Sequence, residues 1–411
     1  MPTDECSRPS TTVSAPNTTS RRAFVSAAGA GATLGLAGCL GGDEDDTIKV
    51  GFVFATSGPY SLLGESHING FQLRIDEELG GELDGREVEY VQRDTGGDPE
   101  TGVTIAEEFI QSEDVDFLVG PVSGAVAFAM EPIVGQYEDE VVWLSTNSAN
   151  NDLSYARGEY QTRNMFLGYQ AWQLAAATGE WVYDNLGETA ALSYADYAAG
   201  IEYTEDFQDG YEEAGGEVLG DVAMPLGEDD YSPYLSTIED TDAEVVWSFF
   251  AGADAVNYIR DFHEFGLDEE MTQAGAAFLL SADTLEAQGE AAEGKYSSSI
   301  YTLDYESETN DEFKSSYESA YDTDPNIYAV LSYDGAQMME TAVEETGGVN
   351  PPELIEAMEG MELDSPRGPF EMDPDLHVPV HDVHMREVQM DDDGEPYNEV
   401  VDTIESVRPP W

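Results

Sequence analysis

From residue 47 onward, short apolar runs alternate with segments whose apolar residues recur every three or four positions. The run 48–54 is rich in β-forming residues, and after a polar loop the segment 68–79 has helical spacing. The same alternation continues with predicted strands at 88–91, 115–119 and 141–144 and predicted helices at 101–110 and 125–137. Strands that alternate with helices predict a parallel sheet covered by helices.

A second series of the same kind starts near residue 170. Its predicted strands are 190–193, 218–224, 245–250 and 276–280, and its predicted helices are 170–186, 201–214 and 253–265. Three further helices are predicted at 310–321, 328–345 and 351–358, followed by strands at 384–388 and 399–404. A body of roughly 370 residues with this pattern suits two α/β lobes.

The segment before residue 47 has the pattern of an export leader. Arg21 and Arg22 precede an apolar, Gly/Ala-rich run from 23 to 37, which is too short to span a bilayer core of about 30 Å. The Ser-Arg-Arg-x-Phe-Val order resembles a twin-arginine signal. Leu-Ala-Gly-Cys at 36–39 resembles a lipobox, so 1–38 is predicted to be a lipoprotein signal and 39–46 a lipidated Cys39 with an acidic tether. The alternative is that Cys39 is an ordinary residue of a signal anchor.

Cysteine and hydropathy add two expectations. Cys6 and Cys39 are the two cysteines of the chain, so the body is expected to have neither a disulfide nor a thiolate metal site. No apolar stretch of about 18 residues follows Cys39, so we expect a soluble body held at the outer face of the cell membrane through a lipid anchor only.

The charge excludes some partners. The 411 residues include 15 Lys+Arg and 86 Asp+Glu, for a formal net charge of -71. This excludes a nucleic-acid binder that neutralises phosphates, and it argues against a basic patch for anionic lipids. Hydrophobic residues make up 41% and aromatic residues 10%, which is enough for folded cores. Acidity with few lysines is typical of extreme halophiles, in whose concentrated salt the repulsion is screened; an acid-rich mesophilic protein is the alternative.

Several ordered motifs give the body a family resemblance. They are Ser-Gly-Pro at 57–59, Val-Gly-Pro-Val-Ser-Gly-Ala at 119–125, the polar loop 145–151, Asp-Tyr-Ala-x-Gly at 196–200, Gly-Glu-Ala-Ala-Glu-Gly at 289–294 and Ser-Pro-Arg-Gly-Pro-Phe at 365–370. With them, residues 47–390 resemble the substrate-binding proteins of ABC importers, in particular the Leu/Ile/Val-binding family with the type I periplasmic-binding fold.

The resemblance implies the architecture and the partners. It implies an α/β fold of two Rossmann-like lobes with parallel sheets, joined by a three-crossing hinge. One lobe would be 47–167 plus 301–375, and the other 168–300 plus 376–411. The expected function is capture of a small solute for an ABC permease and its ATPase, without catalysis or cofactor, by a monomer. A sensory module that feeds a membrane signalling partner is the alternative, and an extracellular hydrolase is a third.

The carboxyl ends of the strands should line the cleft between such lobes. Ser123 opens a predicted helix, whose first-turn N–H groups and hydroxyl suit an anion, although plain N-capping is the alternative. The resemblance implies that Ser123 and the loop with Ser148, Ala149 and Asn150 hold a ligand carboxylate. The other residues expected at the ligand are Leu63, Tyr169, Asp196, Tyr197, Ala251 and Ala277.

One departure from the family pattern bears on the ligand. Leu/Ile/Val-binding members pair the α-ammonium of the ligand with an acidic side chain, and the matching position here is Ala277. Asp196 or Asp254 could reach in from another loop. A buried ammonium without a partner is costly, so an aromatic or aliphatic acid is favoured over an amino acid, which stays open.

The remaining candidates for chemistry are weaker. His377, His381 and His384 cluster in sequence, but Pro379 and alternating valines indicate an extended chain on which they would not converge on a metal. They are expected to be ordinary surface or turn histidines. The acidic run 391–393 is expected to be a solvated turn.

Overall fold

Two β-sheets carry the architecture. The computed structural model describes residues 47–147, 150–154, 162–228 and 230–411. The first sheet has the order β2-β3-β1-β4-β5-β6. Its strands are β1 (Thr47–Phe52), β2 (Glu82–Leu83), β3 (Arg86–Gln92), β4 (Phe117–Val119), β5 (Val142–Ser145) and β6 (Met165–Leu167). All neighbouring pairs are parallel except the β2–β3 hairpin.

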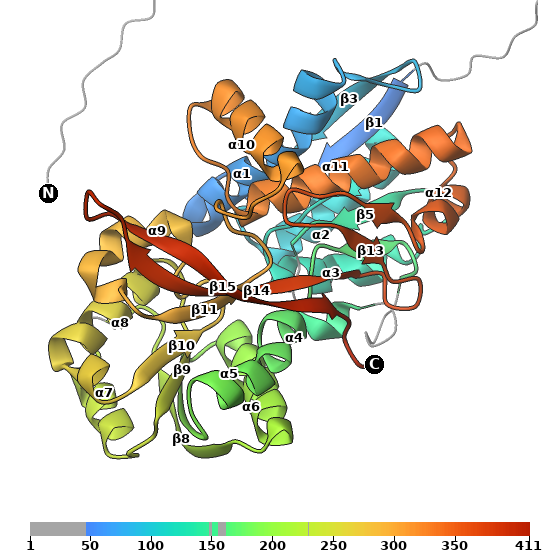
Figure 1. Cartoon of the computed structure of the whole chain (residues 1–411). Coiled ribbons are helices and arrows are strands. Elements are labelled where there is room, and N and C mark those ends of the chain that lie inside the picture. The colour runs from blue at the N-terminus through green and yellow to red at the C-terminus, as the bar shows by residue number, and fades with distance from the viewer. Residues whose placement is uncertain (1–46, 148–149, 155–161, 229) are drawn as a thin grey trace, which may run out of the picture. The chain divides into compact units, whose positions relative to one another are not determined.

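Within the described residues, the first lobe contains six α-helices. They are α1 (Ser61–Gln72), α2 (Pro99–Glu108), α3 (Gly124–Val134), α10 (Glu308–Tyr321), α11 (Ile327–Thr346) and α12 (Pro351–Met358). Helix α1 packs along α11 and α2 packs against α3 (Figure 1). The α1–α11 contact is close because Gly70 has no side chain: a Cβ there would lie 2.0 Å from the carbonyl oxygen of Ala329.

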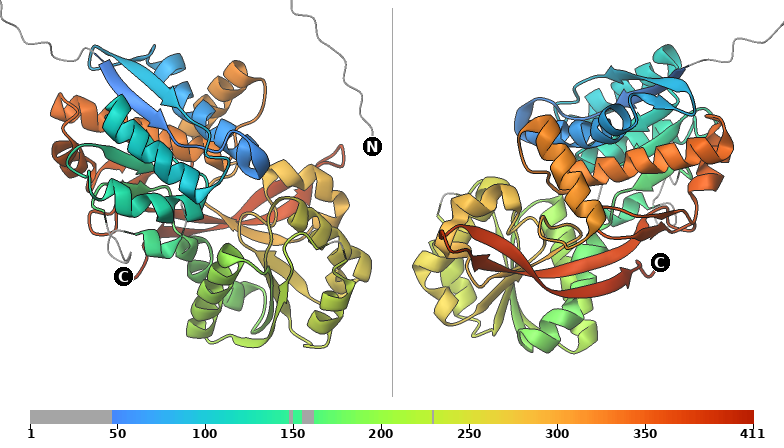
Figure 2. Two further views of the ribbon diagram at one scale, coloured as in Figure 1. Left: turned by 180° about the vertical axis from the view of Figure 1, so that it is seen from behind. Right: turned by 45° about the horizontal axis from the view of Figure 1, so that its top comes forward.

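The second sheet has the path β12-β13-β14-β11-β10-β9-β7-β8, and β15 pairs with β14. Its strands are β7 (Thr189–Ala195), β8 (Glu217–Met224), β9 (Val245–Phe249), β10 (Thr272–Gly275), β11 (Tyr296–Ser299), β12 (Glu362–Leu363), β13 (Phe370–Met372), β14 (Pro379–Met390) and β15 (Pro396–Val407). Strands β7 to β11 pair in parallel, whereas β14 and β15 form a long antiparallel ribbon along β11 (Figure 2).

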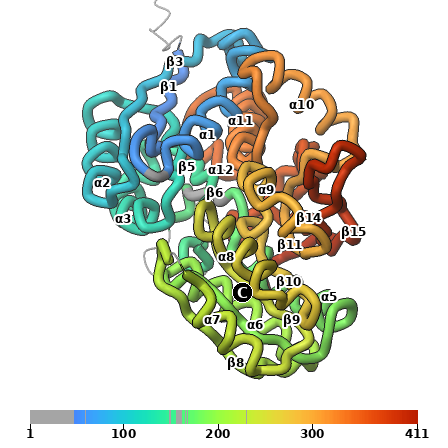
Figure 3. The backbone as a smooth tube through the Cα atoms, turned by 90° about the vertical axis from the view of Figure 1, so that its left-hand side faces the viewer, coloured from blue at the N-terminus to red at the C-terminus, as the bar shows by residue number. Residues whose placement is uncertain are grey.

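The helices of the second lobe are α4 (Ala171–Leu174), α5 (Gly179–Asn185), α6 (Ala198–Ala214), α7 (Ser232–Glu239), α8 (Gly252–Phe265) and α9 (Ala282–Gln288). Helices α6, α7 and α8 gather around β8 and β9 (Figure 3). Within the described residues, no helix combines the length and the apolar character needed to cross a membrane.

The predicted α/β fold of two lobes is confirmed, and two element predictions are wrong. The apolar run 276–280 is not a strand but a buried turn; the strand is β10, just before it. The reason is that β10 buries the polar Gln273, whose Nε2 donates to the carbonyl oxygen of Val246 at 3.1 Å and to Ser248 Oγ at 2.8 Å. The helix predicted at 170–186 is interrupted between α4 and α5.

The chain passes from the first lobe to the second after β6, returns to the helices of the first lobe after β11, and enters the second lobe again along β14. These places agree with the three-crossing hinge that the family resemblance implies. The residue boundaries of the two lobes stay a prediction. Strand β14 pairs with β13 at its start and with β11 further along, so this crossing is hydrogen-bonded to both sides.

A buried ion pair lies beside the first crossing. Arg367 Nε is 2.8 Å from Asp334 Oδ2, and the two side chains are 1% and 5% exposed. Ser365 Oγ donates to the other carboxylate oxygen of Asp334 at 2.6 Å, and Arg367 Nη1 donates to the carbonyl oxygen of Gly168 at 3.1 Å. The pair therefore connects α11, the turn before β13 and the first crossing.

The expectation of surface or turn histidines is wrong for three residues. His377, His381 and His384 are buried, His381 and His384 within β14, and burial lowers the pKa of each. His377 stacks on Phe166 with ring centroids 4.8 Å apart. No group of three His, Cys, Asp or Glu residues in the described ranges is arranged to hold a metal ion.

His67 is buried in the first lobe. Its ring stacks on Phe54 at 4.9 Å, and its Nδ1 lies 2.8 Å from Ser332 Oγ. Burial lowers the pKa of His67 to about 3. The native state therefore holds this ring neutral at pH values where the unfolded chain would protonate it.

We predict that replacing Arg367 with Met lowers the free energy of unfolding by about 3–5 kcal/mol, because Asp334 is left as a buried charge without a partner. Urea denaturation at constant salt measures the loss. The matched control is Arg93→Met, since Arg93 is 42% exposed in its pairs with Glu108 and Glu113 and its loss should cost about 0–1 kcal/mol. Equal losses in both variants would contradict the role of the buried pair.

The second prediction concerns acid sensitivity. Since the unfolded pKa of His67 is near 6.5 and the folded pKa is about 3, the unfolded state binds one more proton between these values, and stability falls as pH decreases through this window. His67→Phe should remove up to about 1.4 kcal/mol per pH unit from the slope of stability against pH between 6.5 and 4. Denaturation curves at several pH values measure this. His263→Gln, at an exposed side chain, is the control, and an unchanged slope in His67→Phe would refute the assignment.

Candidate functional site

A cleft of about 360 Å³ receives residues from both lobes. It lies where the carboxyl ends of β4 and β5 face the amino-terminal end of α6 and the carboxyl end of β9. The lining residues are Tyr60, Leu63, Val122, Ser123, Gly124, Ala125, Phe128, Asn147, Asn150, Tyr169, Tyr197, Ala198, Ala199, Tyr203, Phe249, Ala251, Phe278 and Tyr328.

Ser123 stands at the start of α3. Its backbone is extended, with φ -86° and ψ 127°, and its side chain makes no capping hydrogen bond. Its carbonyl oxygen accepts from the N–H groups of Val126 and Ala127, so the helix proper begins after it. The hydroxyl and the first-turn N–H groups of Gly124 and Ala125 are therefore available at the wall of the cleft, where a helix amino terminus favours a negative charge.

Two asparagines bring the loop after β5 against this helix start. Asn147 Nδ2 donates to the carbonyl oxygen of Val122 at 2.6 Å. Asn150 approaches Gly124 so closely that a Cβ on Gly124 would lie 1.9 Å from Asn150 Oδ1. A side chain at position 124 would therefore displace the side chain of Asn150.

The same loop contacts the second lobe. Asn150 Nδ2 donates to Glu202 Oε2 at 2.6 Å, and the backbone N–H of Asn151 donates to Glu202 Oε1 at 2.8 Å. Asn151 Nδ2 donates to Asp206 Oδ2 at 2.7 Å. Both carboxylates are on α6, so amide donors hold the two lobes together at the edge of the cleft.

The wall from the second lobe is aromatic. Tyr203 on α6 packs against Phe249 at the end of β9 with ring centroids 4.5 Å apart. The ring centroid of Tyr197 lies 6.1 Å from that of Phe249, and the ring centroid of Phe278 lies 5.7 Å from that of Phe249. Tyr60, Phe128, Tyr169 and Tyr328 add aromatic surface from the first lobe and the first crossing. Flat rings of this kind offer stacking and edge contacts to another ring.

Four tyrosines of the cleft are neutral at ordinary pH. Burial raises the pKa of Tyr169, Tyr197, Tyr203 and Tyr328 well above the usual value of 10. Their hydroxyl groups can therefore donate as well as accept hydrogen bonds.

No lining residue of the cleft within the described ranges carries a charged side chain. Leu63, Ser123, Asn150, Tyr169, Tyr197 and Ala251, all expected from the sequence, line the cleft together. Ser148 and Ala149 lie outside the described residues.

Two expected residues lie elsewhere. Asp196 is exposed to solvent, whereas its neighbour Tyr197 lines the cleft. Ala277 is turned into an adjacent cavity, and the following residue, Phe278, faces the cleft. Asp254 does not line the cleft either; its Oδ2 accepts the N–H of Gly227 at 2.9 Å.

Sequence reasoning missed part of the aromatic wall. The residues not anticipated are Tyr60, Phe128, Tyr203, Phe249, Phe278 and Tyr328. Phe249 is the last residue but one of the predicted strand 245–250, so the rule that strand ends line the cleft could have found it. Tyr203 and Tyr328 lie on helices at positions with ordinary core spacing, and nothing in the local pattern distinguishes them.

The chain is similar to known proteins over nearly all of the described residues. The family model described as periplasmic binding protein matches residues 47–395. Leu/Ile/Val-binding protein homolog 6 of Brucella melitensis is 29% identical over 371 residues, which cover 89% of this chain and 93% of that protein.

Solved structures of ABC-transporter binding proteins are also similar to this chain. An ABC transporter substrate-binding protein from Sphaerobacter thermophilus is 28% identical, with a TM-score of 0.84 over 88% of this chain and 98% of that one. A solute-binding protein from Rhodopseudomonas palustris BisB5, in complex with 3,4-dihydroxybenzoic acid, is 26% identical, with a TM-score of 0.80 over 89% and 99%. Another from R. palustris, in complex with benzoate, is 28% identical, with a TM-score of 0.76 over 86% and 96%.

Proposed function

This chain belongs to the periplasmic binding protein family, whose members are non-enzymatic substrate-binding components of ABC transporters, and we propose that its cleft closes on a small carboxylic acid, above all an aromatic one. The lobes that close are 47–167 with 301–375 and 168–300 with 376–411. The loaded protein delivers the acid to an ABC permease and its ATPase.

The uncharged lining of the cleft carries the proposal. A bound amino acid would bury its ammonium group beside aromatic rings, and no lining residue within the described ranges offers a carboxylate. Such an unpaired charge costs several kcal/mol. A carboxylate without an ammonium avoids this cost, since Ser123 and the first-turn N–H groups of α3 can hold it.

The aromatic wall extends the argument to the rest of the solute. Tyr203, Phe249 and Phe278 form one cluster of rings. The buried Tyr169 and the partly buried Tyr328 lie beside the same space. Neutral tyrosine hydroxyls could bond to a ring hydroxyl of the solute. The two R. palustris proteins, with 3,4-dihydroxybenzoic acid and benzoate bound, support an aromatic acid as the class.

A ligand screen tests this function. We expect 4-hydroxybenzoate to raise the melting temperature of the protein in molar salt more than leucine at equal concentration, because only the amino acid must bury an ammonium group. Differential scanning fluorimetry measures the shifts, and isothermal titration calorimetry then gives the affinity. A leucine shift as large as that of the aromatic acid, or larger, would sink the proposal.

A matched pair of variants locates the carboxylate. Ser123→Ala should weaken binding of the acid by about 1–3 kcal/mol, or roughly 5- to 150-fold, through loss of a charge-assisted hydrogen bond. Ser236→Ala, on the exposed face of α7, should leave the affinity unchanged. Equal affinity in both variants would show that the carboxylate of the acid is not bound at the start of α3.

Export and anchoring complete the proposed function. Residues 1–38 serve as a twin-arginine lipoprotein signal, and Cys39 carries the lipid that holds the monomeric body at the outer face of the membrane. The arginine pair at 21–22 and the sequence Leu-Ala-Gly-Cys at 36–39 support this. The acidic composition suits a protein that works in concentrated salt, as in extreme halophiles.

We predict that Cys39→Ser moves the protein from the membrane fraction to the medium or to an uncleaved precursor, because no acyl chain can be attached. Immunoblots of fractions from expressing cells, with mass spectrometry of the purified amino terminus, measure the change. Cys6→Ser is the control and should leave the distribution unchanged, since that residue precedes the proposed cleavage site. Retention of a normally processed Cys39→Ser protein on the membrane would disprove the lipid anchor.

A further inference from the structure

The described part of the chain buries three cationic side chains of Lys or Arg: Lys295, Arg367 and Arg386. Lys295 Nζ lies 2.7 Å from Asp268, and Arg367 Nε lies 2.8 Å from Asp334. Arg386 has no carboxylate within ion-pair distance among the described residues. In a chain with 86 acidic residues, a buried arginine without an acidic partner is unexpected.

The contacts of Arg386 leave its charge unbalanced. It lies on β14, and its Nη2 donates to Ser297 Oγ at 2.9 Å and to the carbonyl oxygen of Ala277 at 3.4 Å. Its Nε is buried and has no hydrogen-bond partner. Desolvation alone lowers the pKa of Arg386 to about 9, with no acidic group acting in the opposite direction. The guanidinium is still charged at neutral pH, so its burial is costly unless a ligand supplies the missing negative charge.

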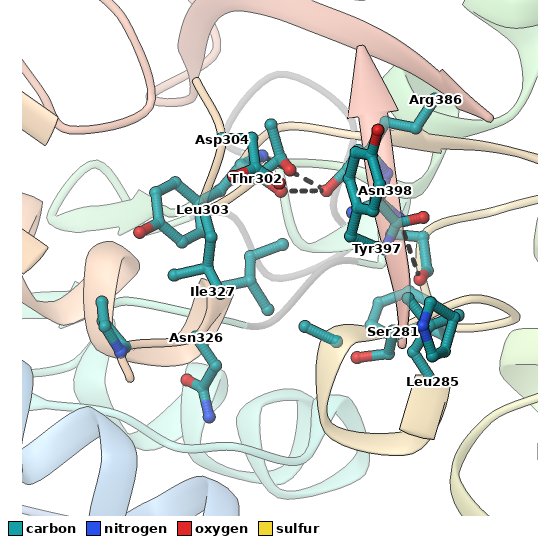
Figure 4. A pocket seen from close by; sticks show the side chains of 17 residues that line it. Ser281, Leu285, Thr302, Leu303, Asp304, Asn326, Ile327, Arg386, Tyr397 and Asn398 are labelled. Atoms are coloured by element: carbon teal, nitrogen blue, oxygen red, sulfur yellow. Dashed lines mark hydrogen bonds between the residues drawn. The ribbon is translucent and has the colours of Figure 1, made fainter. Parts of the chain in front are cut away.

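Arg386 lines a cavity next to the cleft (Figure 4). The cavity has a volume of about 160 Å³, which is several times the roughly 30 Å³ of a water molecule. Phe278 lines both this cavity and the cleft, so the two spaces share a wall. The polar residues of the lining are Ser281, Ser299, Tyr301, Thr302, Asp304, Asn326, Arg386, Tyr397 and Asn398.

The charges of the lining restrict the occupant. Asp304, the other charged residue that lines the cavity, forms no ion pair with Arg386, and no acidic group acts on the pKa of this guanidinium. An occupant that balances the buried charge must therefore accept hydrogen bonds from Arg386.

We propose that this cavity binds a small monovalent inorganic anion, of the size of a halide or nitrate, against the guanidinium of Arg386. The anion accepts a charge-assisted hydrogen bond from the guanidinium of Arg386, and water molecules of its shell fill the rest of the cavity. Concentrated salt favours this binding in two ways: it supplies the anion, and it shortens the range over which the acidic surface repels it, to about 3 Å at 1 M. The site does not depend on the identity of the solute in the cleft.

Bromide provides a direct test. Crystals of the whole protein grown or soaked in sodium bromide should show an anomalous peak in contact with the Arg386 guanidinium. The peak should persist when 4-hydroxybenzoate is added, because the anion and the solute occupy separate spaces. A map without a peak at Arg386 would overturn the proposal, and so would a peak displaced by the aromatic acid, which would make Arg386 the partner of the solute carboxylate.

A solution measurement uses matched variants. The melting temperature of the unaltered protein should rise with bromide by about 2 °C per tenfold increase above the dissociation constant, beyond the effect of ionic strength set by sodium sulfate, whose larger, divalent anion does not match the site. Arg386→Met should lose this excess, whereas Arg260→Met, which removes the same charge from the exposed face of α8, should keep it. An equal bromide excess in both variants would refute the site, and the crystal experiment decides the matter if Arg386→Met does not fold.

Discussion

The buried pair of Arg367 and Asp334 is the constraint on which the geometry of the cleft depends. Asp334 belongs to α11, the helix whose first turn carries Tyr328 into the cleft. Arg367 also donates to the carbonyl oxygen of Gly168, one residue before Tyr169. One guanidinium therefore fixes the position of α11 relative to the first crossing, and with it the separation of two tyrosines that line the cleft. Because the ion pair anchors this crossing, the backbone of the crossing can rotate as a hinge while the first-lobe side of the cleft keeps its geometry.

The charge distribution explains how such an acidic protein can bind an acid. The long-range field of 71 excess negative charges opposes an anionic solute, but the lining of the cleft contributes none of those charges within the described residues. The favourable terms are short in range: the hydroxyl of Ser123, the first-turn N–H groups of α3 and the neutral tyrosines. Concentrated salt screens the field while leaving contacts of hydrogen-bond length almost unaffected. Acidity at the surface and binding of an acid are therefore compatible.

The fold could be predicted from the sequence because it rests on periodicity, which is a local signal. Most predicted strands and helices overlap the observed ones, and the exceptions have physical causes. Gln273 is polar yet buried in β10, because groups of the neighbouring strand β9 accept the hydrogen bonds of its side chain. A hydropathy pattern therefore predicts a strand in the apolar run that follows instead of at β10. The short strand β11 reads Tyr-Ser-Ser-Ser, which has no apolar alternation at all.

The site was less predictable, because side-chain direction is not a local property. The neighbours Asp196 and Tyr197 were both expected at the ligand, and the chain can turn only one of them inward. At the next such place only Ala277 was expected, whereas its neighbour Phe278 is the residue that lines the cleft. A resemblance aligned without gaps locates a loop to within a residue, and one residue is enough to exchange the inward and outward side chains. Tyr203 and Tyr328 lie on helices that are far apart in the sequence and face the same cleft only in the folded state, so no spacing along the chain predicts them together.

Closure and ligand binding are physically joined at one residue. Asn150 lines the cleft, lies against the first residue of α3 and donates to Glu202 on the helix of the other lobe. A carboxylate held at the start of α3 would therefore sit beside the hydrogen bonds that keep the lobes together. The lobes can open by exchanging the amides for water, at a modest cost in free energy, since water also donates to carboxylates. A solute that orders Asn150 would shift this balance toward the closed state, and the shift could be no larger than the difference between its affinities for the two states.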